Sequence, residues 1–135
     1  NAEGISRPLE AEDFMVVAPY RAQVRLITEA LDANPATRGV LVGTVDKFQG
    51  QQAAVVLYSM TTSRGDLSPR STSFLFSRNR LNVALSRAQC LAYLICTEEL
   101  LDSRARSVDD MRRVSTLCAF VEESKRQIDG PSRRP

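Results

Sequence analysis

The sequence predicts an α/β domain with a mainly parallel sheet flanked by helices. Four continuous apolar runs have the length of buried strands and are bounded by polar or turn residues; they cover 14–18, 40–44, 55–60 and 91–96. Between and after these runs, apolar residues recur at helical spacing. Strands that are apolar on both faces are typical of parallel sheets covered by helices. The alternation of strands with helices favours the same class.

Composition limits the classes of protein that fit. With 135 residues, 43% of them hydrophobic, the chain suits one domain with its own core. The formal net charge of +2 is too small to indicate nucleic-acid binding by itself. No apolar run approaches the roughly 18 residues of a membrane span, and the amino terminus lacks the form of a signal peptide.

The chain contains no histidine, and its three cysteines lack the paired spacing of metal ligands. They are Cys90, Cys96 and Cys118, each within an apolar run. We therefore expect no metal site, thiols that serve as small hydrophobic groups, and a reduced, cytoplasmic protein.

The ends of the chain differ in composition from its middle. We interpret 1–12 as a polar lead-in, with Asn1 and Ala2 as a remnant of cloning, and 129–135 as a tail. The domain itself should cover 13–128. Because the sequence begins in the middle of a domain-like pattern, we expect it to be a fragment excised from a longer protein.

The first strand run leads into a helix. After Tyr20, Val24, Ile27 and Leu31 repeat at i, i+3 and i+7, and an Asn-Pro pair at 34–35 ends the pattern. Two topologies fit the next pair of runs. If both are parallel strands, the ten residues from 45 to 54 allow only one short helical turn; a hairpin is the alternative. In a parallel sheet this polar segment would lie at the carboxyl ends of the strands, where open α/β sheets bind ligands.

The stretch from Asn79 to Cys96 combines an amphipathic helix with the last strand run. Its apolar face is formed by Leu81, Leu85 and Ala88. Arg80 and Arg87 are seven residues apart, so they share a helix face about 10 Å apart, with only Ala84 between them. A guanidinium offers a fixed fork of donors that suits phosphate oxygens. Ordinary surface ion pairs are the alternative use of the two arginines.

Two further regions complete the chain. The loop 61–77 lies in a basic window with five arginines against Asp66; the arginines are Arg64, Arg70, Arg78, Arg80 and Arg87. A solvated connector explains such a window as well as a nucleic-acid contact does. Thr97 can cap a short helix through Leu101, and a longer helix begins near 109. We expect its inward face, lying on the sheet, to contain Met111, Val114, Cys118 and Val121.

The run Arg80-Leu-Asn-Val-Ala-Leu-Ser-Arg-Ala88 resembles motif VI of superfamily 1 helicases. The resemblance implies that Arg87 is an arginine finger, reaching the γ-phosphate of ATP held by a preceding domain, and that Arg80 also belongs to the nucleotide site. Such a group can contribute about three to five orders of magnitude in rate.

The run Gly43-Thr-Val-Asp-Lys-Phe-Gln-Gly-Gln-Gln52 resembles motif V of the same superfamily. The resemblance implies that Thr44 and its neighbour Asp46 contact the backbone of single-stranded nucleic acid. It also implies that Gln49 and Gly50 form the turn leading to the nucleotide. A plain polar turn, with Gly50 at positive φ, would fit the spacing too.

This run departs from the family pattern twice. Gln52 stands where a Glu commonly contacts the ATP ribose, and Ala54 stands where an Asp is frequent. A Gln still offers an acceptor, without the charge, so the grip on nucleotide is expected to be weaker.

The junction Ala18-Pro-Tyr-Arg-Ala-Gln23 resembles motif IV. By that resemblance Tyr20 and Gln23 face the cleft or the bound strand. Packing and capping in the first turn of a helix are the alternative roles for these two residues.

Together, the three motifs imply a RecA-like second motor domain, that is, a P-loop NTPase fold without its own P-loop. The chain has no Gly-x-x-x-x-Gly-Lys-[Ser/Thr] sequence and no acidic pair for Mg²⁺. We therefore expect ATP and Mg²⁺ to be bound mainly by a missing N-terminal RecA-like domain, and the fragment alone to be inactive. The expected partner is single-stranded nucleic acid, DNA before RNA. A RecB-like nuclease domain is a further candidate, and no membrane is involved.

Two other functions fit the same residues. One is a nucleic-acid-binding module without ATPase activity, suggested by the arginine-rich window. The other is a structural, degenerate copy of a helicase domain, suggested by Gln52 and Ala54.

Overall fold

The computed structural model describes residues 6–60, 77–97, 100 and 108–128. Contacts divide the chain into two compact units. The first combines Asn1–Thr61 with Asn82–Ile95, and the second combines Thr62–Leu81 with Cys96–Pro135. The sheet and every sheet residue discussed below belong to the first unit.

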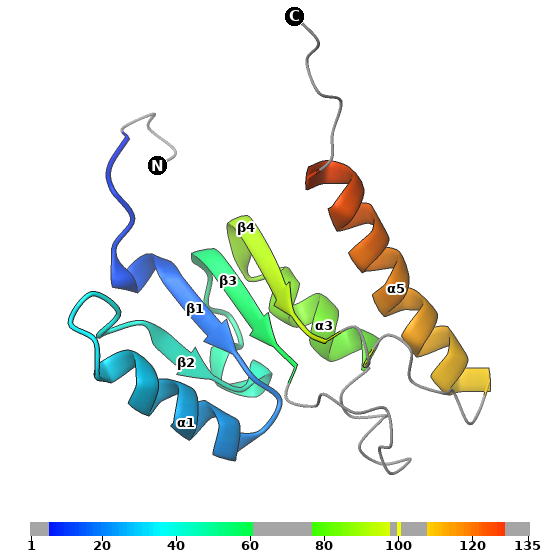
Figure 1. The fold of residues 1–135 in the computed structure, drawn as a ribbon, viewed down its shortest axis with the longest axis horizontal. Coiled ribbons are helices and arrows are strands. Elements are labelled where there is room, and N and C mark those ends of the chain that lie inside the picture. Colours follow the sequence, from blue (N-terminus) through cyan, green and yellow to red (C-terminus); the bar gives the residue numbers. More distant parts are fainter. Residues whose placement is uncertain (1–5, 61–76, 98–99, 101–107, 129–135) are drawn as a thin grey trace, which may run out of the picture. The chain divides into compact units, whose positions relative to one another are not determined.

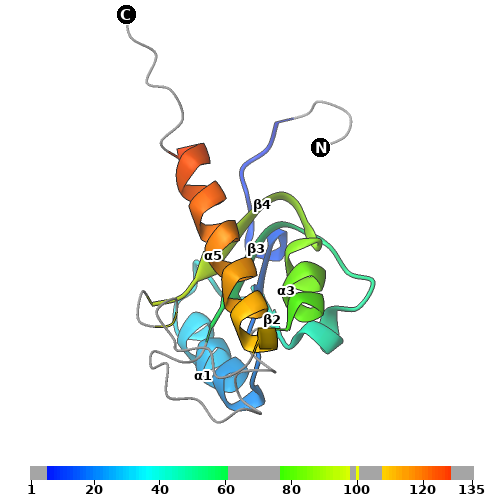
Figure 2. The ribbon, with the colours of Figure 1, turned by 90° about the vertical axis from the view of Figure 1, so that its right-hand side faces the viewer.

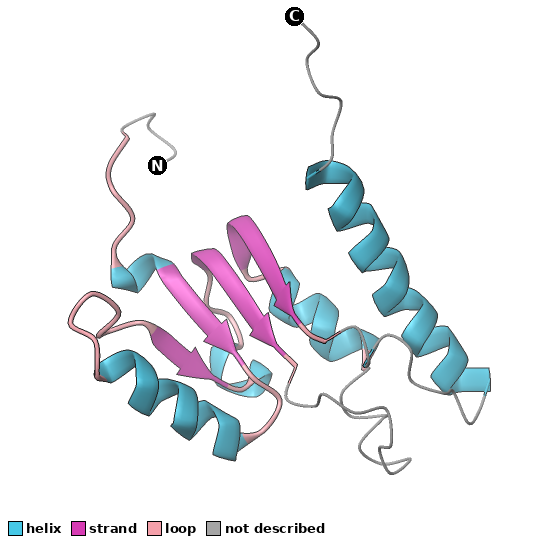
Figure 3. Cartoon of the chain, viewed as in Figure 1, coloured by secondary structure: helices cyan, strands magenta, loops and turns pink. Residues whose placement is uncertain are grey.

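The first unit is built on a four-stranded sheet (Figure 1). Its strands are β1 (Phe14–Val17), β2 (Leu41–Gly43), β3 (Ala53–Ser59) and β4 (Ala88–Ile95), arranged in the order β2-β1-β3-β4. All three neighbouring pairs are parallel, and the four arrows point the same way in Figure 3. The expected α/β class with a parallel sheet is confirmed, and the architecture is that of a RecA-like fold.

One face of the sheet forms the best-buried part of the core. Met15 and Val17 of β1 are paired with Val56 and Tyr58 of β3, and all four are at most 1% exposed. Paired residues of neighbouring parallel strands point to the same face. Burial of one such side chain contributes about 1.5–3 kcal/mol, so these positions hold the two central strands together.

Helix α1 (Arg21–Asp32) covers the other face. The amide Nε2 of Gln23 donates a hydrogen bond to Oγ of Ser59 at 2.9 Å, and Ser59 ends β3. The predicted helix after Tyr20 is confirmed, with Tyr20 at its N-cap position. Near the carboxyl end of α1, a cavity of about 340 Å³ is lined by Leu31 of the helix and Val16 of the sheet, among others.

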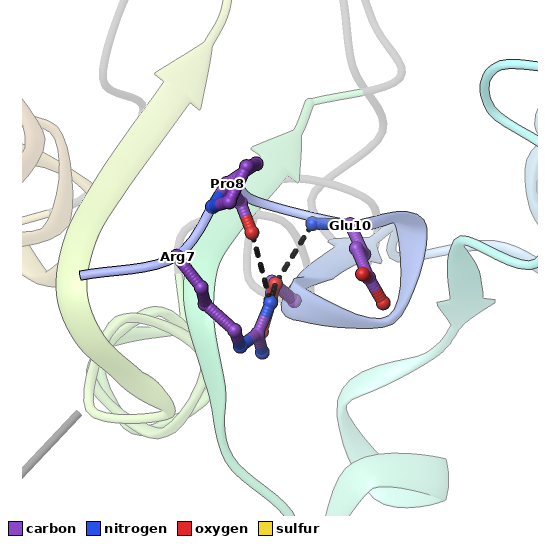
Figure 4. A network of polar contacts seen from close by, with 4 residues as sticks. Arg7, Pro8 and Glu10 are labelled. Carbon is purple, nitrogen blue, oxygen red and sulfur yellow. Dashed lines mark hydrogen bonds and ion pairs between the residues drawn. The ribbon is translucent and has the colours of Figure 1, made fainter. Parts of the chain in front are cut away.

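The segment before β1 is anchored to the domain. Arg7 makes a bidentate ion pair with Asp13, with N–O distances of 2.6 and 2.7 Å (Figure 4). The backbone N–H of Glu10 donates to the same carboxylate at 2.8 Å. Asp13 ends a 3-10 turn, Ala11–Asp13, that runs directly into β1. The predicted lead-in is thus tied to the start of β1 through Asp13, although residues 6–10 are all exposed.

Helix α3 (Arg78–Leu85) is shorter than predicted. It ends two residues before Arg87, and β4 begins at Ala88, inside the predicted helix. The backbone N–H of Ala53 donates to the Arg87 carbonyl at 3.0 Å, and Ala53 pairs with Ala88. This pairing with β3 draws the chain into the sheet earlier than its local periodicity indicates.

Strand β4 is not buried on both faces as the sequence predicts. Leu91, Tyr93 and Ile95 alternate along it, share one face, and are 45%, 51% and 50% exposed. The apolar run therefore predicted the strand correctly, but its burial on both faces is wrong.

The second unit contains α5 (Val108–Ile128), a single uninterrupted helix (Figure 2). Its predicted inward face is wrong at Met111, which is 61% exposed, whereas Leu117 is 2% exposed. Leu117 and the half-buried Phe120, Val121 and Ser124 follow the i, i+3, i+4 and i+7 pattern of one helix face. The predicted short helix from Thr97 lies mostly outside the described residues.

The cysteines divide into two kinds. Cys90 is exposed, so the expectation that all three thiols pack as small hydrophobic groups is wrong for this residue. Cys96 and Cys118 are half-buried. Burial, and secondarily the neighbouring Cys118, raises the pKa of the Cys96 thiol, which keeps it protonated at neutral pH.

Among the described helices, none is long and apolar enough to cross a membrane.

The Arg7–Asp13 pair makes a prediction about pH. The hydrogen bond from Arg7, followed by that from the Glu10 backbone, lowers the pKa of Asp13. Because the folded-state pKa is depressed, the pair stabilises the fold above the ordinary aspartate pKa of about 3.9. This contribution is lost as the pH falls through the lower folded-state pKa. We expect Arg7→Gln to raise the pKa of Asp13 part of the way back, measured by an NMR titration of its carboxyl carbon.

Arg25→Gln is the matched control, because Arg25 is exposed and, among the described residues, pairs with Glu29 and not with Asp13. It should leave the titration of Asp13 unchanged. An Asp13 midpoint that is the same in Arg7→Gln and in the unsubstituted chain would contradict the assignment.

Candidate functional site at the two edges of the sheet

The segment 44–52 connects opposite edges of the sheet. It leaves β2 at the carboxyl edge, forms the 3-10 turn η2 (Val45–Phe48), and enters β3 at the amino edge. The parallel alternative is confirmed and the hairpin is wrong. The expectation that the whole segment lies at the carboxyl edge is therefore wrong as well. Since β3 has seven residues, the two edges are about 20 Å apart.

Two glycines shape this segment for different reasons. Gly50 has φ of +82°, as expected for the plain polar turn, and an L side chain rarely adopts this conformation. Gly43 instead faces a close approach. A Cβ at this position would lie 2.6 Å from Cδ of Lys47 and 2.9 Å from two ring atoms of Phe48. The turn η2 therefore folds back tightly over the end of β2.

Three of the four predicted nucleic-acid residues, Thr44, Asp46 and Tyr20, lie at the carboxyl edge. Thr44 occupies the N-cap position of η2, yet its side chain makes no capping hydrogen bond. Asp46 is exposed, and Tyr20 is half-buried. The carboxyl ends of β1 and β2 are joined here, since the Ala18 N–H donates to the Gly43 carbonyl at 3.0 Å.

Gln23, the fourth predicted residue, is different. Its amide is engaged with Ser59, 36 residues away in sequence. The packing role that the sequence left open for Gln23 is therefore realised.

The predicted nucleotide residues of motifs V and VI meet at the amino edge. Gln52 directly precedes β3 and Arg87 directly precedes β4, and the Ala53–Arg87 backbone bond joins the two strands at this point. Nε2 of Gln89 also donates to Oε1 of Gln52 at 3.4 Å. Gln49 and Gly50 are exposed on the way to this edge.

The guanidinium of Arg87 is held at one end only. Its Nε donates to the Val83 carbonyl at 3.2 Å, at the carboxyl end of α3. Within the part of the chain that the structure describes, no carboxylate pairs with Arg87, and its two terminal nitrogens make no hydrogen bond. The side chain is half-buried, so it is neither enclosed nor fully solvated.

The predicted helix face shared by Arg80 and Arg87 is wrong, because Arg87 follows the helix instead of lying on it. Ala84, expected to leave space for an approaching group, is 1% exposed. Arg80 is half-buried and belongs to the second unit by its contacts. Arg64 and Arg70 of the basic window lie outside the described residues, as does the side chain of Arg78.

Sequence reasoning missed three residues of these edges. Ser59 anchors Gln23, Gln89 contacts Gln52, and Lys47 folds over Gly43. The first two contacts join residues more than 30 positions apart, so no local pattern signals them. A lysine inside a tight turn beside a glycine was the one available signal for the third.

Residues 3–99, which include both edges of the sheet, match the family model described as an AAA domain. The chain is a superfamily 1 helicase domain of this AAA family.

Several curated helicases share the domain. The DNA replication ATP-dependent helicase/nuclease DNA2 of Mus musculus is 42% identical over 124 residues, 90% of this chain. The DNA polymerase alpha-associated DNA helicase A of Schizosaccharomyces pombe is 40% identical over 79 residues, 58% of this chain. The RNA helicase Mov10l1 of Homo sapiens is 33% identical over 103 residues, 74% of this chain. The matched regions are 10%, 11% and 8% of these proteins, so the chain spans about a tenth of their length.

The helicase domain thus presents two polar edges of different character. The amino edge offers a guanidinium with unpaired terminal nitrogens, which suits an anion. The carboxyl edge offers a hydroxyl and an exposed turn beside it. Phe48, 2% exposed, fixes the connection between them.

The Gln23–Ser59 bond generates a test of the role of Gln23 in the helicase domain. Gln23→Ala and Ser59→Ala should each destabilise the fold, and the double variant should lose less than the sum. We expect a coupling of about 1 kcal/mol, the net contribution of one hydrogen bond. The measurement is urea unfolding of the four proteins. Gln51→Ala, at an exposed glutamine of the 44–52 segment, is the control and should show no coupling with Ser59→Ala. A coupling near zero would show that the bond to Ser59 does not hold α1.

Proposed function

We propose that this chain is the C-terminal motor domain of an ATP-dependent superfamily 1 helicase. In this proposal Arg87 acts as an arginine finger on a nucleotide bound mainly by a preceding RecA-like domain. The membership of the family is the starting point, and the state of Arg87 is the observation that carries the proposal.

Arg87 has the features that a finger needs. One nitrogen is fixed on the Val83 carbonyl, which orients the guanidinium, while no described carboxylate neutralises it. A fixed donor fork that is aimed by the protein stabilises developing charge without reorganisation. An arginine of purely structural use would instead be expected to have an acidic partner or several carbonyl partners.

The other predicted nucleotide residues would complete the contact with nucleotide. Gln52 offers an amide to the ribose, and Gln49 and Gly50 provide the turn that leads to it. Arg80 is proposed as a second phosphate contact. Mg-ATP, when bound, supplies the phosphoryl bond whose hydrolysis drives the motion. The role of this chain is to bind and orient from the other side of the cleft, since it contains no P-loop. Alone, it should not hydrolyse ATP.

The carboxyl edge would contact single-stranded nucleic acid. The proposed contacts are Thr44, Asp46 and Tyr20. The Thr44 hydroxyl makes no capping hydrogen bond to the turn η2. Gln23 would contribute through the placement of α1. A domain that meets nucleotide at one edge and the strand at the other can convert closure on ATP into a step along the strand.

The relatives guide the choice of partners without deciding it. Two of those named above are DNA helicases and one is an RNA helicase. We favour DNA, a preceding RecA-like domain in the same polypeptide, and a RecB-like nuclease as an accompanying domain. A cytoplasmic location without a membrane partner remains our expectation.

The finger assignment is tested by Arg87→Ala in the polypeptide that joins this chain to its ATP-binding domain. We expect ATP turnover to fall about a thousandfold or more, as for other arginine fingers. Strand binding should stay within twofold, because Arg87 lies at the opposite edge. Arg87→Lys should also be impaired, since an ammonium lacks the planar fork. Turnover is measured by phosphate release and strand binding by fluorescence anisotropy.

Arg25→Ala is the control, because Arg25 is exposed and pairs with Glu29 of the same helix. It should retain full turnover. Thermal unfolding of each variant separates loss of the Val83 bond from loss of catalysis. Near-normal ATPase in a folded Arg87→Ala protein would refute the assignment.

A degenerate, non-hydrolytic module is the second candidate function, and one observation favours it. The amide oxygen of Gln52 already accepts a hydrogen bond from Gln89. A neutral residue that is satisfied within the protein contributes less to nucleotide binding than a charged one.

Gln52→Glu distinguishes the two functions. In a working motor, the restored carboxylate should tighten nucleotide binding by about fivefold, because a charge-assisted bond replaces a neutral one. In a degenerate module, nucleotide affinity should not change. The measurement is titration of the joined polypeptide with a fluorescent ATP analogue. Gln51→Glu, the same change at the adjacent exposed residue, is the control and should have no effect.

A further inference from the structure

Lys47 folds back against the strand that precedes its own turn. Its Nζ donates to the Val42 carbonyl at 3.0 Å, in a partly buried bond. The same Nζ lies 5.7 Å from the centre of the Phe48 ring. Its Cδ occupies the space where a side chain at Gly43 would begin. Lys47 is exposed overall, yet its stem and its ammonium each have a contact within the domain.

The carbonyl that Lys47 contacts belongs to the outer side of β2. Successive carbonyls along a strand point in opposite directions. The Gly43 carbonyl accepts from Ala18 of the β1 segment, so the Val42 carbonyl points away from β1. Among the described strands, β2 lies at the end of the sheet. Lys47 thus satisfies an edge carbonyl that no described strand reaches, a common use of lysine at sheet edges.

The turn that Lys47 closes is held by two buried side chains but by few hydrogen bonds of its own. It is a single 3-10 turn, whose hydrogen bonds have poorer geometry than those of an α-helix. Val45 and Phe48 anchor its two ends in the core, at 7% and 2% exposed. The polar residues of the turn, including Thr44, would be less fixed without the bond from Lys47 to β2.

We propose that Lys47 is a positioning residue of the strand-binding edge, holding the turn Thr44–Phe48 in the form that presents Thr44 to the nucleic-acid backbone. This inference rests on the proposed function of the carboxyl edge. A turn that is fixed before binding avoids the entropy cost of ordering on the ligand, so the effect should appear in strand affinity. The ammonium acts through the turn and does not itself contact a phosphate.

The experiment uses the joined polypeptide and a single-stranded oligonucleotide, with Kd measured by anisotropy at several salt concentrations. Lys47→Met keeps the aliphatic stem over Gly43 and removes the ammonium. Lys125→Met is the matched control, because Lys125 is the chain's other lysine and is exposed on α5. We expect Lys47→Met to raise Kd about tenfold over the control, the size of one lost hydrogen bond from a charged donor.

Two further readouts separate positioning from direct contact. The dependence of Kd on salt should be the same in Lys47→Met and Lys125→Met, whereas loss of a phosphate contact would lower the slope by about one ion. Thr44→Val should weaken binding, and adding Lys47→Met to it should have no further effect, because both act through Thr44. An unchanged Kd, a reduced salt slope or additive losses would each overturn the proposal.

Failure of the underlying function gives a different result. If the unsubstituted polypeptide does not bind the strand, or if Thr44→Val binds normally, the assignment of the carboxyl edge fails irrespective of Lys47. If the unsubstituted polypeptide binds the strand and Thr44→Val weakens that binding, but Lys47→Met matches its control, only the positioning role fails.

Discussion

The parallel direction of β2 and β3 is the constraint on which the site depends. A chain that leaves one parallel strand must return the length of the sheet before it can start the next. Here the return is made by residues 44–52, which contain one 3-10 turn and no α-helix. The same short segment therefore has one end among the candidate strand contacts and the other beside Arg87. Two chemically different edges are connected through a few residues of backbone.

Burial of the Val45 and Phe48 side chains makes this short return possible. Phe48 is inserted against the face of the sheet that holds Val17 and Tyr58, because Gly43, its close neighbour, is paired with Val17. Dispersion contacts of a buried ring are individually weak and collectively large. They hold a segment whose own hydrogen bonds are few, and they leave its polar residues at the surface.

The fold could be predicted from the sequence where the determining forces are local. Strand runs, the helix after Tyr20 and the positive φ of Gly50 follow from apolar content, spacing and glycine stereochemistry. The end of α3 could not be predicted, because a backbone bond from Ala53 decides it. The inward face of α5 was misplaced because its apolar residues occupy two adjacent faces, and only packing selects between them. In the candidate site, the motifs named Gln52 and Arg87, which lie at the same edge of the sheet, and the roles of these two residues stay predictions. The motifs did not predict that Gln23 would be engaged by Ser59, since that contact depends on the tertiary fold.

Only Ser86 and Arg87 separate α3 from β4. Both backbone groups of Arg87 are hydrogen-bonded: its carbonyl accepts from Ala53 of β3, and its N–H donates to the Ala84 carbonyl in the last turn of α3. The connection therefore cannot accommodate another residue without a change in one of these elements. An inserted residue would have to be absorbed by unwinding the helix or by sliding β4 one position. The second course would turn Tyr93 and its neighbours to the opposite face of the sheet. The spacing between helix and strand is therefore a strict requirement of this fold, whereas longer surface connections tolerate a change of length more easily.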